Sequence, residues 1–419
     1  MSEQRMKSLR LPLLIVVVVL LQTVLMMGLA SAQTFTTLYA FTGMDDGEHP
    51  VDYGHMVMDA KGNVYGTTTS TFGQQQGDGT VFRVTPTGQE KVIHRFTGKD
   101  GKDPVPALIH DNAGNLYGTT WAGGAYGWGA VFKLTMGTTG WTETIMYSFQ
   151  NAGDGFSPQG LAVDSHGNIY GVAQGGRYGK YHTGHGTVFR IDTSGNFTVL
   201  YSFKGGADGI APLGVVVDPA GNVYGTTMEG GDLNCNVPIG FTGCGLVFRI
   251  SPTGQETVLH SFTGNGDGDY LVGSSGLILD VKGRALYGAT YFGGESCALD
   301  TYGCGVIFKL DATGETVVYS FTGEIDGGAA NAIVRDAAGN FFGSTGSGGD
   351  LACNPPYGCG ELFKLDTSGN FTLLYAFEEP DLQPNGLVLD PADNLYGISQ
   401  IGGNNYGTVF ELTNAKNAE

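Results

Sequence analysis

The fold is decided by residues 160–203, which read GLAVDSHGNIYGVAQGGRYGKYHTGHGTVFRIDTSGNFTVLYSF. This stretch contains four short segments rich in β-branched and aromatic residues, and Gly, Asp or Asn stand between them. Such segments are typical of antiparallel strands joined by tight turns. The helical spacing of apolar residues at i, i+3 and i+4 is absent from residue 33 onward. The stretch therefore predicts one four-stranded antiparallel sheet.

The same pattern occurs seven times, roughly every 55 residues. An aromatic residue followed by Gly marks the second segment of each copy: Tyr65, Tyr117, Tyr170, Tyr224, Tyr287, Phe342 and Tyr396. A phenylalanine marks the third segment: Phe82, Phe132, Phe189, Phe248, Phe308, Phe363 and Phe410. The repeats predict an all-β, seven-bladed β-propeller with four antiparallel strands per blade, in a single domain over residues 33–419.

The phase of the repeat predicts how the ring closes. Residues 35–42 (FTTLYAFT) match the fourth strand of a unit, but no first three strands precede them. The last unit, residues 386–413, contains three strands and lacks the fourth. We expect the N-terminal strand to complete the C-terminal blade, which removes open sheet edges and joins the two ends of the ring.

Composition limits the classes of function. The chain has 71 glycines in 419 residues, with no three-residue period, so collagen is excluded. Hydrophobic residues make up 41% and charged residues 15%, which favours a large packed core with glycine in turns and beside the axis. The net charge of −19 disfavours binding to nucleic acid or to anionic lipid.

The N-terminus predicts export. Arg5, Lys7 and Arg10 precede the apolar run 11–21, and Ala30-Ser31-Ala32 provides a small-residue cleavage site. This arrangement is typical of a signal peptide, here residues 1–32. The alternative is an uncleaved anchor, because the apolar stretch of about 20 residues is long enough to cross a bilayer. After cleavage we expect no membrane span, and a secreted, periplasmic or extracellular protein.

All six cysteines lie in the second half of the chain, in three local pairs: Cys235/Cys244, Cys297/Cys304 and Cys353/Cys359. Zinc sites use closer CxxC-type pairs, so the spacing does not fit them. In an exported chain, locally paired cysteines predict disulfides. They would lie in the loops between the second and third strands of three consecutive blades, where they could brace a binding surface or only stabilise the loops.

Two sets of connections are long and variable, and antiparallel order places both on the same rim, around the channel mouth. Loops at such a mouth usually carry function. His55 is the one bulky residue among seven positions expected nearest the axis, where the others are Ala or Gly. The candidate binding residues are His55, Gln159, Asn331 and Asn385 at the mouth, Trp121 and Trp128 in one long loop, and Tyr181, His182 and His185 in another.

Each candidate has a plainer alternative. The two tryptophans could stack on sugar rings or pack against the neighbouring blade. The H-x-x-H run at 182–185 lacks a third ligand in its own loop, which favours an exposed polar loop over a metal site. The Asp-Gly pairs of the other long loops, such as Asp46, favour turn capping over a carboxylate ring. No cofactor is indicated. Calcium at Asp267-Gly268-Asp269 is the one candidate, and it is disfavoured because that run lacks the full calcium-loop pattern and its terminal Glu.

The recurring LYGTT…GG…GTVFKL…G unit resembles the GloVer-type tandem repeat of secreted bacterial proteins, over residues 35 to about 413. The strand pattern is also similar to that of NHL-type propellers. The resemblance implies an exported propeller and brings no established activity with it. The family is described as having a choice of C-terminal anchors. Because this sequence ends at Glu419, soon after the last expected strand, we expect release from the cell.

No catalytic motif is found: G-x-S-x-G, H-E-x-x-H, S-x-x-K and a phosphate loop are all absent from the sequence. The leading hypothesis is therefore a non-catalytic binding or scaffold module, with a carbohydrate or a cell-surface partner at the long-loop rim. The alternative is a propeller enzyme, a glycan lyase or hydrolase or a lactonase, with its site at the channel mouth.

Overall fold

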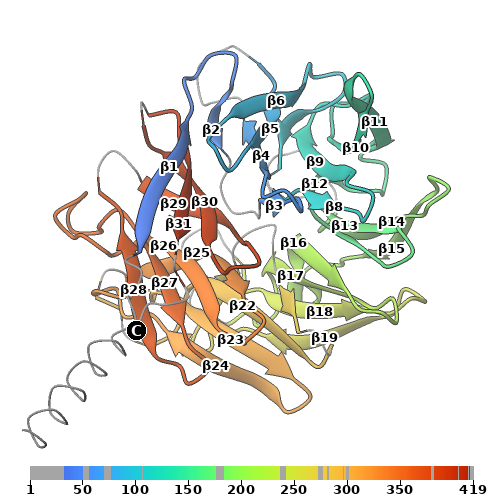
Figure 1. The fold of residues 1–419 in the computed structure, drawn as a ribbon. Helices are drawn as coiled ribbons and strands as arrows, with labels where there is room; N and C mark the ends of the chain where they lie inside the picture. The colour runs from blue at the N-terminus through green and yellow to red at the C-terminus, as the bar shows by residue number, and fades with distance from the viewer. Residues whose placement is uncertain are drawn as a thin grey trace, which may run out of the picture.

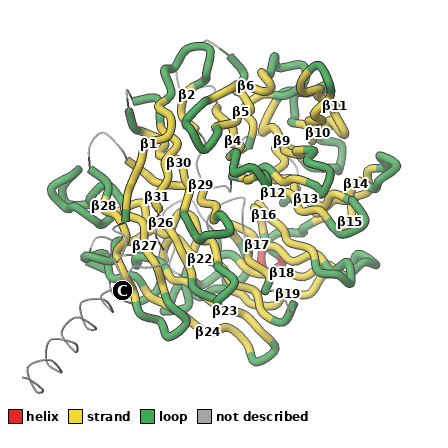
Figure 2. Tube along the Cα trace, viewed as in Figure 1, coloured by secondary structure: helices red, strands yellow, loops and turns green. Residues whose placement is uncertain are grey.

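The computed structural model describes residues 33–50, 56–69, 77–105, 107–175, 184–235, 242–271, 277–280, 283–295, 297–298, 302–378, 382–403, 405–413 and 415. The expected signal peptide, His55, Tyr181 and His182 lie outside these residues. The described residues form seven antiparallel sheets of four or five strands and one short 3₁₀ helix, η1 (Gly206–Asp208). Figure 1 shows the sheets arranged around a common centre, and Figure 2 shows how strongly strand and loop dominate. The predicted all-β, seven-bladed propeller is confirmed.

Each blade runs from an inner first strand to an outer fourth strand, and in blades 1, 2 and 5 the first strand is divided into two short pieces. Blade 1 contains β2 (Glu48–Pro50), β3 (Val57–Met58), β4 (Val64–Thr69), β5 (Thr80–Val84) and β6 (Glu90–Arg95). Blade 2 contains β7 (Lys102–Pro104), β8 (Ile109–His110), β9 (Leu116–Ala122), β10 (Ala130–Gly137) and β11 (Gly140–Ser148). Blade 3 contains β12 (Phe156–Val163), β13 (Ile169–Gln174), β14 (Thr187–Ile191) and β15 (Phe197–Ser202). Blade 4 contains β16 (Ile210–Val217), β17 (Val223–Glu229), β18 (Leu246–Ile250) and β19 (Glu256–Ser261).

The remaining blades repeat this order. Blade 5 contains β20 (Asp269–Leu271), β21 (Ile278–Leu279), β22 (Ala285–Phe292), β23 (Val306–Asp311) and β24 (Gly314–Ser320). Blade 6 contains β25 (Gly328–Arg335), β26 (Phe341–Ser347), β27 (Glu361–Leu365) and β28 (Phe371–Ala376). Blade 7 contains β29 (Leu382–Leu389), β30 (Leu395–Ile401), β31 (Thr408–Thr413) and, from the other end of the chain, β1 (Thr34–Ala40).

The ring closes as the repeat phase predicts. Strand β1 pairs antiparallel with β31, with Phe35 opposite Leu412 and Thr36 opposite Glu411. In Figure 1 the blue first strand lies beside the red last strands. Strand β31 therefore has a partner on each side, and the two ends of the described chain are held in one sheet.

Phenylalanine pairs join each blade to the next. The ring that ends one fourth strand meets the ring of the next blade's third strand, with 5.0–5.4 Å between centroids. The seven pairs are Phe41–Phe82, Phe96–Phe132, Phe149–Phe189, Phe203–Phe248, Phe262–Phe308, Phe321–Phe363 and Phe377–Phe410. The Gly after the marker aromatic makes room for them: a Cβ on Gly66 would lie 2.5 Å from Phe82 Cζ.

The first strand begins earlier than expected in four blades. It starts at Phe156, Ile210, Gly328 and Leu382, several residues before the expected Gly-Leu segment. Proline fits in these stretches because irregularities in the register interrupt the ladder beside it, as at Pro158 and Pro212. Gln159, Asn331 and Asn385 therefore lie within their strands rather than at the strand starts.

Candidate functional site

Both sets of long loops lie on one rim, where they contact one another. In blade 2, the Gly124 N–H donates to the carbonyl oxygen of Gly98 in the loop that enters the blade. In blade 4, Gly231 donates in the same way to Gly206. In these two blades the long loops are therefore held to each other by backbone hydrogen bonds.

The rim gathers most of the exposed apolar side chains of the described residues. Ten large hydrophobic side chains are exposed, and seven belong to the long loops or to the strand ends that carry them. The seven are Met44, Trp121, Tyr126, Leu233, Ile325, Leu351 and Tyr357. This distribution makes the rim the candidate interaction surface.

The two candidate tryptophans have different environments. Trp121, at the end of β9, is 48% exposed, and Tyr126 in the following loop is 58% exposed. Trp128 instead packs on Phe156 of blade 3, with 5.8 Å between ring centroids. Trp121 and Tyr126 thus present their rings to solvent on the rim, whereas Trp128 contributes to the junction between blades.

Three disulfides brace the rim of blades 4, 5 and 6, as the sequence predicts: Cys235–Cys244, Cys297–Cys304 and Cys353–Cys359. The last lies in the β26–β27 loop, which also carries the exposed Leu351 and Tyr357. Ile325, in the loop that enters the same blade, is 78% exposed. Blade 6 therefore presents three apolar side chains from two adjoining rim loops, one of them cross-linked.

A hollow of about 210 Å³ opens on the same rim between blades 7 and 1. Met44, Glu48, Arg95 and Tyr406 line it together with glycine and threonine residues. A larger hollow, about 580 Å³, lies on the opposite rim, where Trp141 of blade 2 faces Tyr65 of blade 1. Only the first hollow joins the loops that the sequence singled out.

The three amide side chains expected at the channel mouth are buried. Gln159 is 9%, Asn331 6% and Asn385 1% exposed. Their Nδ2 or Nε2 groups donate to backbone carbonyls: Gln159 to Ser157, Asn331 to Pro384 of the next blade, and Asn385 to Gln383. In this structure these side chains hold strand ends and neighbouring blades in register.

His185 lies at the end of the loop between β13 and β14, and its ring covers the backbone of Gly205 in the loop that enters blade 4. A Cβ on Gly205 would lie 2.6 Å from His185 Nε2. His185 therefore packs between adjoining rim loops of two blades. The first histidine of the H-x-x-H run, His182, and the neighbouring candidate Tyr181 lie outside the described part of the chain.

In six blades the aspartate of the loop that enters the blade caps its own turn, and Asp381, in the loop that enters the seventh, lies outside the described residues. Asp46 accepts hydrogen bonds from the Thr42 N–H and hydroxyl, the Met44 N–H and the Tyr39 hydroxyl. These hydrogen bonds outweigh partial burial and hold the pKa of Asp46 below its usual range. The contacts agree with the turn-capping interpretation of the Asp-Gly pairs.

The calcium candidate has two different carboxylates. Asp267 caps its turn through the Thr263 N–H and hydroxyl and lies 3.3 Å from His260 Nε2. Asp269 is 2% exposed, and burial raises its pKa to about 7, with the Asp267 charge adding to the rise. The two carboxylates therefore have different surroundings: Asp267 caps a turn, and Asp269 is enclosed.

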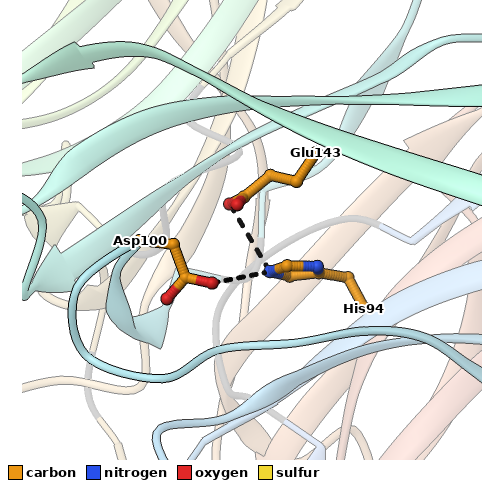
Figure 3. Close-up of side chains that lie close together, drawn as sticks. All are labelled: His94, Asp100 and Glu143. Atoms are coloured by element: carbon orange, nitrogen blue, oxygen red, sulfur yellow. Dashed lines mark ion pairs between the residues drawn. The ribbon is translucent and has the colours of Figure 1, made fainter.

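A cluster that the sequence analysis missed lies between blades 1 and 2. His94 of β6 and Glu143 of β11 come from the outer strands of the two blades, and Asp100 from the loop that joins them (Figure 3). His94 Nε2 lies 3.3 Å from Asp100 Oδ2 and 3.4 Å from Glu143 Oε1. All three ligand-type atoms lie within 4.8 Å of one another.

Burial shifts the pKa values of the groups in this cluster. The three side chains are only 14–20% exposed. Burial raises the pKa of Glu143 to about 7, and the nearby Asp100 charge raises it further. Burial also lowers the pKa of His94, although Asp100 opposes that shift. The imidazole thus faces two carboxyl groups, and the repulsion between their charges contributes to the raised pKa of Glu143.

The sequence does contain a signal for the cluster. In four other junctions a tyrosine occupies the position of His94 and donates to the loop aspartate: Tyr39, Tyr147, Tyr201 and Tyr319. Aligning the seven fourth strands shows His in place of Tyr at 94 and 260 only. The third partner, Glu143, is 49 positions away in the next unit. It can be assigned only when the packing between blades is known.

Within the described part of the chain, no helix has the length and hydrophobicity that a bilayer crossing requires.

Comparison with known proteins supports the repeat assignment. The family model of the Gloeobacter/Verrucomicrobia repeat matches residues 52–298 and 237–419. No curated protein matches the sequence significantly. Similar solved structures include the extracellular domain of a protein described as a one-component system of B. thetaiotaomicron. It has a TM-score of 0.53 at 10% identity, over 90% of this chain and 39% of that chain.

Two enzymes are more distant in shape. A gluconolactonase of Xanthomonas campestris gives a TM-score of 0.42 at 14% identity, over 91% of this chain and 89% of that one. A luciferin-regenerating enzyme gives 0.44 at 11% identity, over 91% and 95%. At these identities, likeness to a solved structure speaks for the fold alone.

Proposed function

Because the chain belongs to the Gloeobacter/Verrucomicrobia repeat family and folds as a seven-bladed propeller, we propose that it is an exported, non-catalytic binding module whose long-loop rim takes up carbohydrate. The observation that carries the proposal is the placement of exposed apolar side chains. Seven of the ten in the described residues lie on that one rim. The other three lie elsewhere: Met136 near the end of β10 on the opposite rim, and Val258 and Leu373 on outer strands.

The choice of carbohydrate rests on the chemistry of blade 2. Trp121 and Tyr126 present two exposed aromatic rings in a loop rich in glycine. Sugar rings bind to aromatic faces through their apolar C–H surface, and aromatic residues lose little conformational entropy on binding. The net charge of −19 favours a neutral glycan over an acidic one, because like charges repel.

Export is part of the same proposal. Residues 1–32 have the features of a signal peptide, and the three rim disulfides are compatible with an oxidising compartment. Comparing secreted and cell-associated fractions of cells that express the full chain, with N-terminal sequencing, tests cleavage after Ala32. An intact N-terminus in the membrane fraction would support the uncleaved anchor instead.

A glycan array probed with protein lacking residues 1–32 tests carbohydrate binding. We expect binding to neutral glycans that falls at least tenfold in Trp121→Ala, about the loss of one aromatic contact of 1.4 kcal/mol. Met136→Ala is the matched control, since Met136 is 56% exposed but lies away from the rim. Absence of any glycan ligand, or equal binding by Trp121→Ala, would contradict the proposal.

The same assay separates binding from catalysis. A propeller lyase, hydrolase or lactonase would change the mass of its ligand during incubation, whereas a binding module returns the ligand unaltered. Mass spectrometry of each array hit after incubation with the protein in solution therefore distinguishes the two functions.

A further inference from the structure

We propose that His94, Asp100 and Glu143 form a zinc-type divalent cation site that fastens blade 1 to blade 2 at their outer edge. The site is separate from the long-loop rim and does not depend on the proposed carbohydrate function. It combines one nitrogen and two carboxylate oxygens, a ligand set that zinc and related transition ions accept.

The geometry is the first argument. Ligand atoms about 2.0–2.1 Å from a tetrahedral ion are separated from one another by roughly 3.3–3.4 Å. His94 Nε2 lies 3.3 Å from Asp100 Oδ2 and 3.4 Å from Glu143 Oε1. These separations match two edges of such a tetrahedron, and the third ligand pair lies within 4.8 Å. The fourth position would be left to water, since the three side chains keep 14–20% exposure.

The second argument is that an ordinary ion pair does not account for the contacts. Charge-assisted N–H···O hydrogen bonds are about 2.7–2.9 Å long, clearly shorter than the separations here. His94 Nε2 and Glu143 Oε1 are buried atoms that make no hydrogen bond of good geometry. Among the described residues, neither Asp100 nor Glu143 is paired with a lysine or an arginine. A cation between them would neutralise both carboxylates.

The third argument is that neighbouring groups orient the ligands. Asp100 Oδ1 accepts hydrogen bonds from the Thr97 N–H at 2.8 Å and the Thr97 hydroxyl at 2.9 Å, which turns Oδ2 toward His94. The His94 ring packs edge-on against Phe96, with 4.6 Å between centroids, which fixes its plane. Metal sites commonly use such outer contacts to hold their ligands.

The repeat supplies an internal comparison. A second junction contains the same residue types, His260, Asp267 and Glu315. There His260 Nε2 also lies 3.3 Å from the aspartate, Asp267 Oδ2. Within the described part of the chain, only the His94 group brings all three ligand atoms within 4.8 Å of one another. We therefore assign the site to the junction of blades 1 and 2 and use the junction of blades 4 and 5, which contains His260, as its control.

The test is a metal titration of protein purified without a polyhistidine tag and stripped with chelator. Zn²⁺ is titrated against a chromophoric chelator, and Co²⁺ is followed by the visible absorption of a tetrahedral ion. We expect one equivalent to bind, and zinc to raise the melting temperature of the wild type by mass action. Binding should weaken at least about tenfold in Glu143→Gln and in His94→Tyr.

His94→Tyr should fold, because tyrosine occupies the same position in four other junctions. Its melting temperature without metal checks this. Glu315→Gln, at the second junction, should bind zinc like the wild type. The proposal is overturned if the wild type binds neither Zn²⁺ nor Co²⁺, if both cluster variants bind like the wild type, if Glu315→Gln abolishes binding, or if only Ca²⁺ binds.

Discussion

The ring of Phe41 meets the ring of Phe82 edge to face, with 5.0 Å between their centroids and 69° between their planes. Phe41 directly follows β1, the strand that completes the C-terminal blade, and Phe82 lies in β5 of blade 1. The pair therefore joins the blade that contains both ends of the chain to its neighbour. The internal junction of blades 3 and 4 has the same contact, Phe203–Phe248, at 5.1 Å.

This equivalence predicts that the closing junction is as stable as an internal one. Phe41 is 0% and Phe203 is 4% exposed, so truncation of either leaves a comparable cavity. We expect Phe41→Ala and Phe203→Ala each to lower the free energy of unfolding by about 3–5 kcal/mol. Guanidinium titrations of both variants check this. A Phe41→Ala cost below half that of Phe203→Ala would indicate a weakly held closing strand.

A larger residue should be tolerated at the glycine that faces the third-strand phenylalanine only when that phenylalanine is replaced by a smaller side chain. A Cβ on Gly66 would lie 2.5 Å from Phe82 Cζ, and Gly66 does not have a positive φ, so the conflict is steric alone. We expect Gly66→Ala to destabilise by about 1–3 kcal/mol. Phe82→Leu should lower the free energy of unfolding by less in the Gly66→Ala background than in the wild type, because the smaller side chain relieves the clash that the added Cβ creates.

A double-mutant cycle by chemical unfolding measures that coupling. Gly137→Ala is the control, since Gly137 has no positive φ and a Cβ there would lie 3.4 Å from the carbonyl oxygen of Gly140. It should change stability by less than about 1 kcal/mol. Additive effects of Gly66→Ala and Phe82→Leu would show that the ring does not dictate the glycine.

The sequence was sufficient for the architecture because the repeat carries it. Seven marker aromatics set the number of blades, the unpaired first strand set the closure, and the local cysteine pairs set the disulfides. The His94 cluster could not be derived in the same way. His94 and Glu143 belong to different units, and only the packing of outer strands brings Nε2 and Oε1 to 3.4 Å. Likewise, no local pattern predicts that the side chains of Gln159, Asn331 and Asn385 are buried. They are buried because the first strand of their blades begins earlier than the repeat suggests, which places them inside the strand.

A ring of backbone hydrogen bonds between blades is another feature that the sequence does not predict, because the residues with positive φ that make these bonds are not glycines. The Ala329 N–H donates to the carbonyl oxygen of Cys304 in the preceding blade at 3.0 Å, and Ala329 has φ +56°. The equivalent residues of all seven blades share this conformation and donate in the same way: His49, Asp103, Ser157, Ala211, Tyr270, Ala329 and Gln383. The hydrogen bond is thus made at the expense of local backbone strain.

Relieving that strain should stabilise the ring. We expect Ala329→Gly to raise the free energy of unfolding by up to about 1 kcal/mol, because glycine accepts positive φ freely. Ala329→Val should lower it by more than about 1 kcal/mol, since a β-branched residue tolerates this conformation poorly. Ala330→Gly, one position along the same strand and fully buried, should destabilise. Thermal melts of the three variants check the order, and a destabilised Ala329→Gly would contradict it.

Glu361 should make the stability of the protein depend on pH. This residue begins β27 and is 0% exposed, and its carboxylate oxygens have no hydrogen-bond partner of good geometry among the described residues. Burial raises its pKa to about 9, and the Asp326 charge adds to the rise. The folded state therefore holds a proton between about pH 4.5 and 9 that the unfolded chain has released. Stability should fall across this window by up to about 1.4 kcal/mol per pH unit.

Glu361→Gln removes the ionisable group while keeping the shape of the side chain. The free energy of unfolding of the variant should therefore be close to that of the wild type near pH 4.5 and increasingly higher than it toward pH 9. Glu361→Thr tests the same point with the residue found at the equivalent positions Thr80, Thr187 and Thr408. Glu324→Gln, at an exposed site in the loop that enters the same blade, removes the same formal charge and should leave the pH profile unchanged. Urea unfolding at four pH values decides the matter: parallel profiles for the wild type and Glu361→Gln would mean that the carboxylate ionises normally in the folded protein.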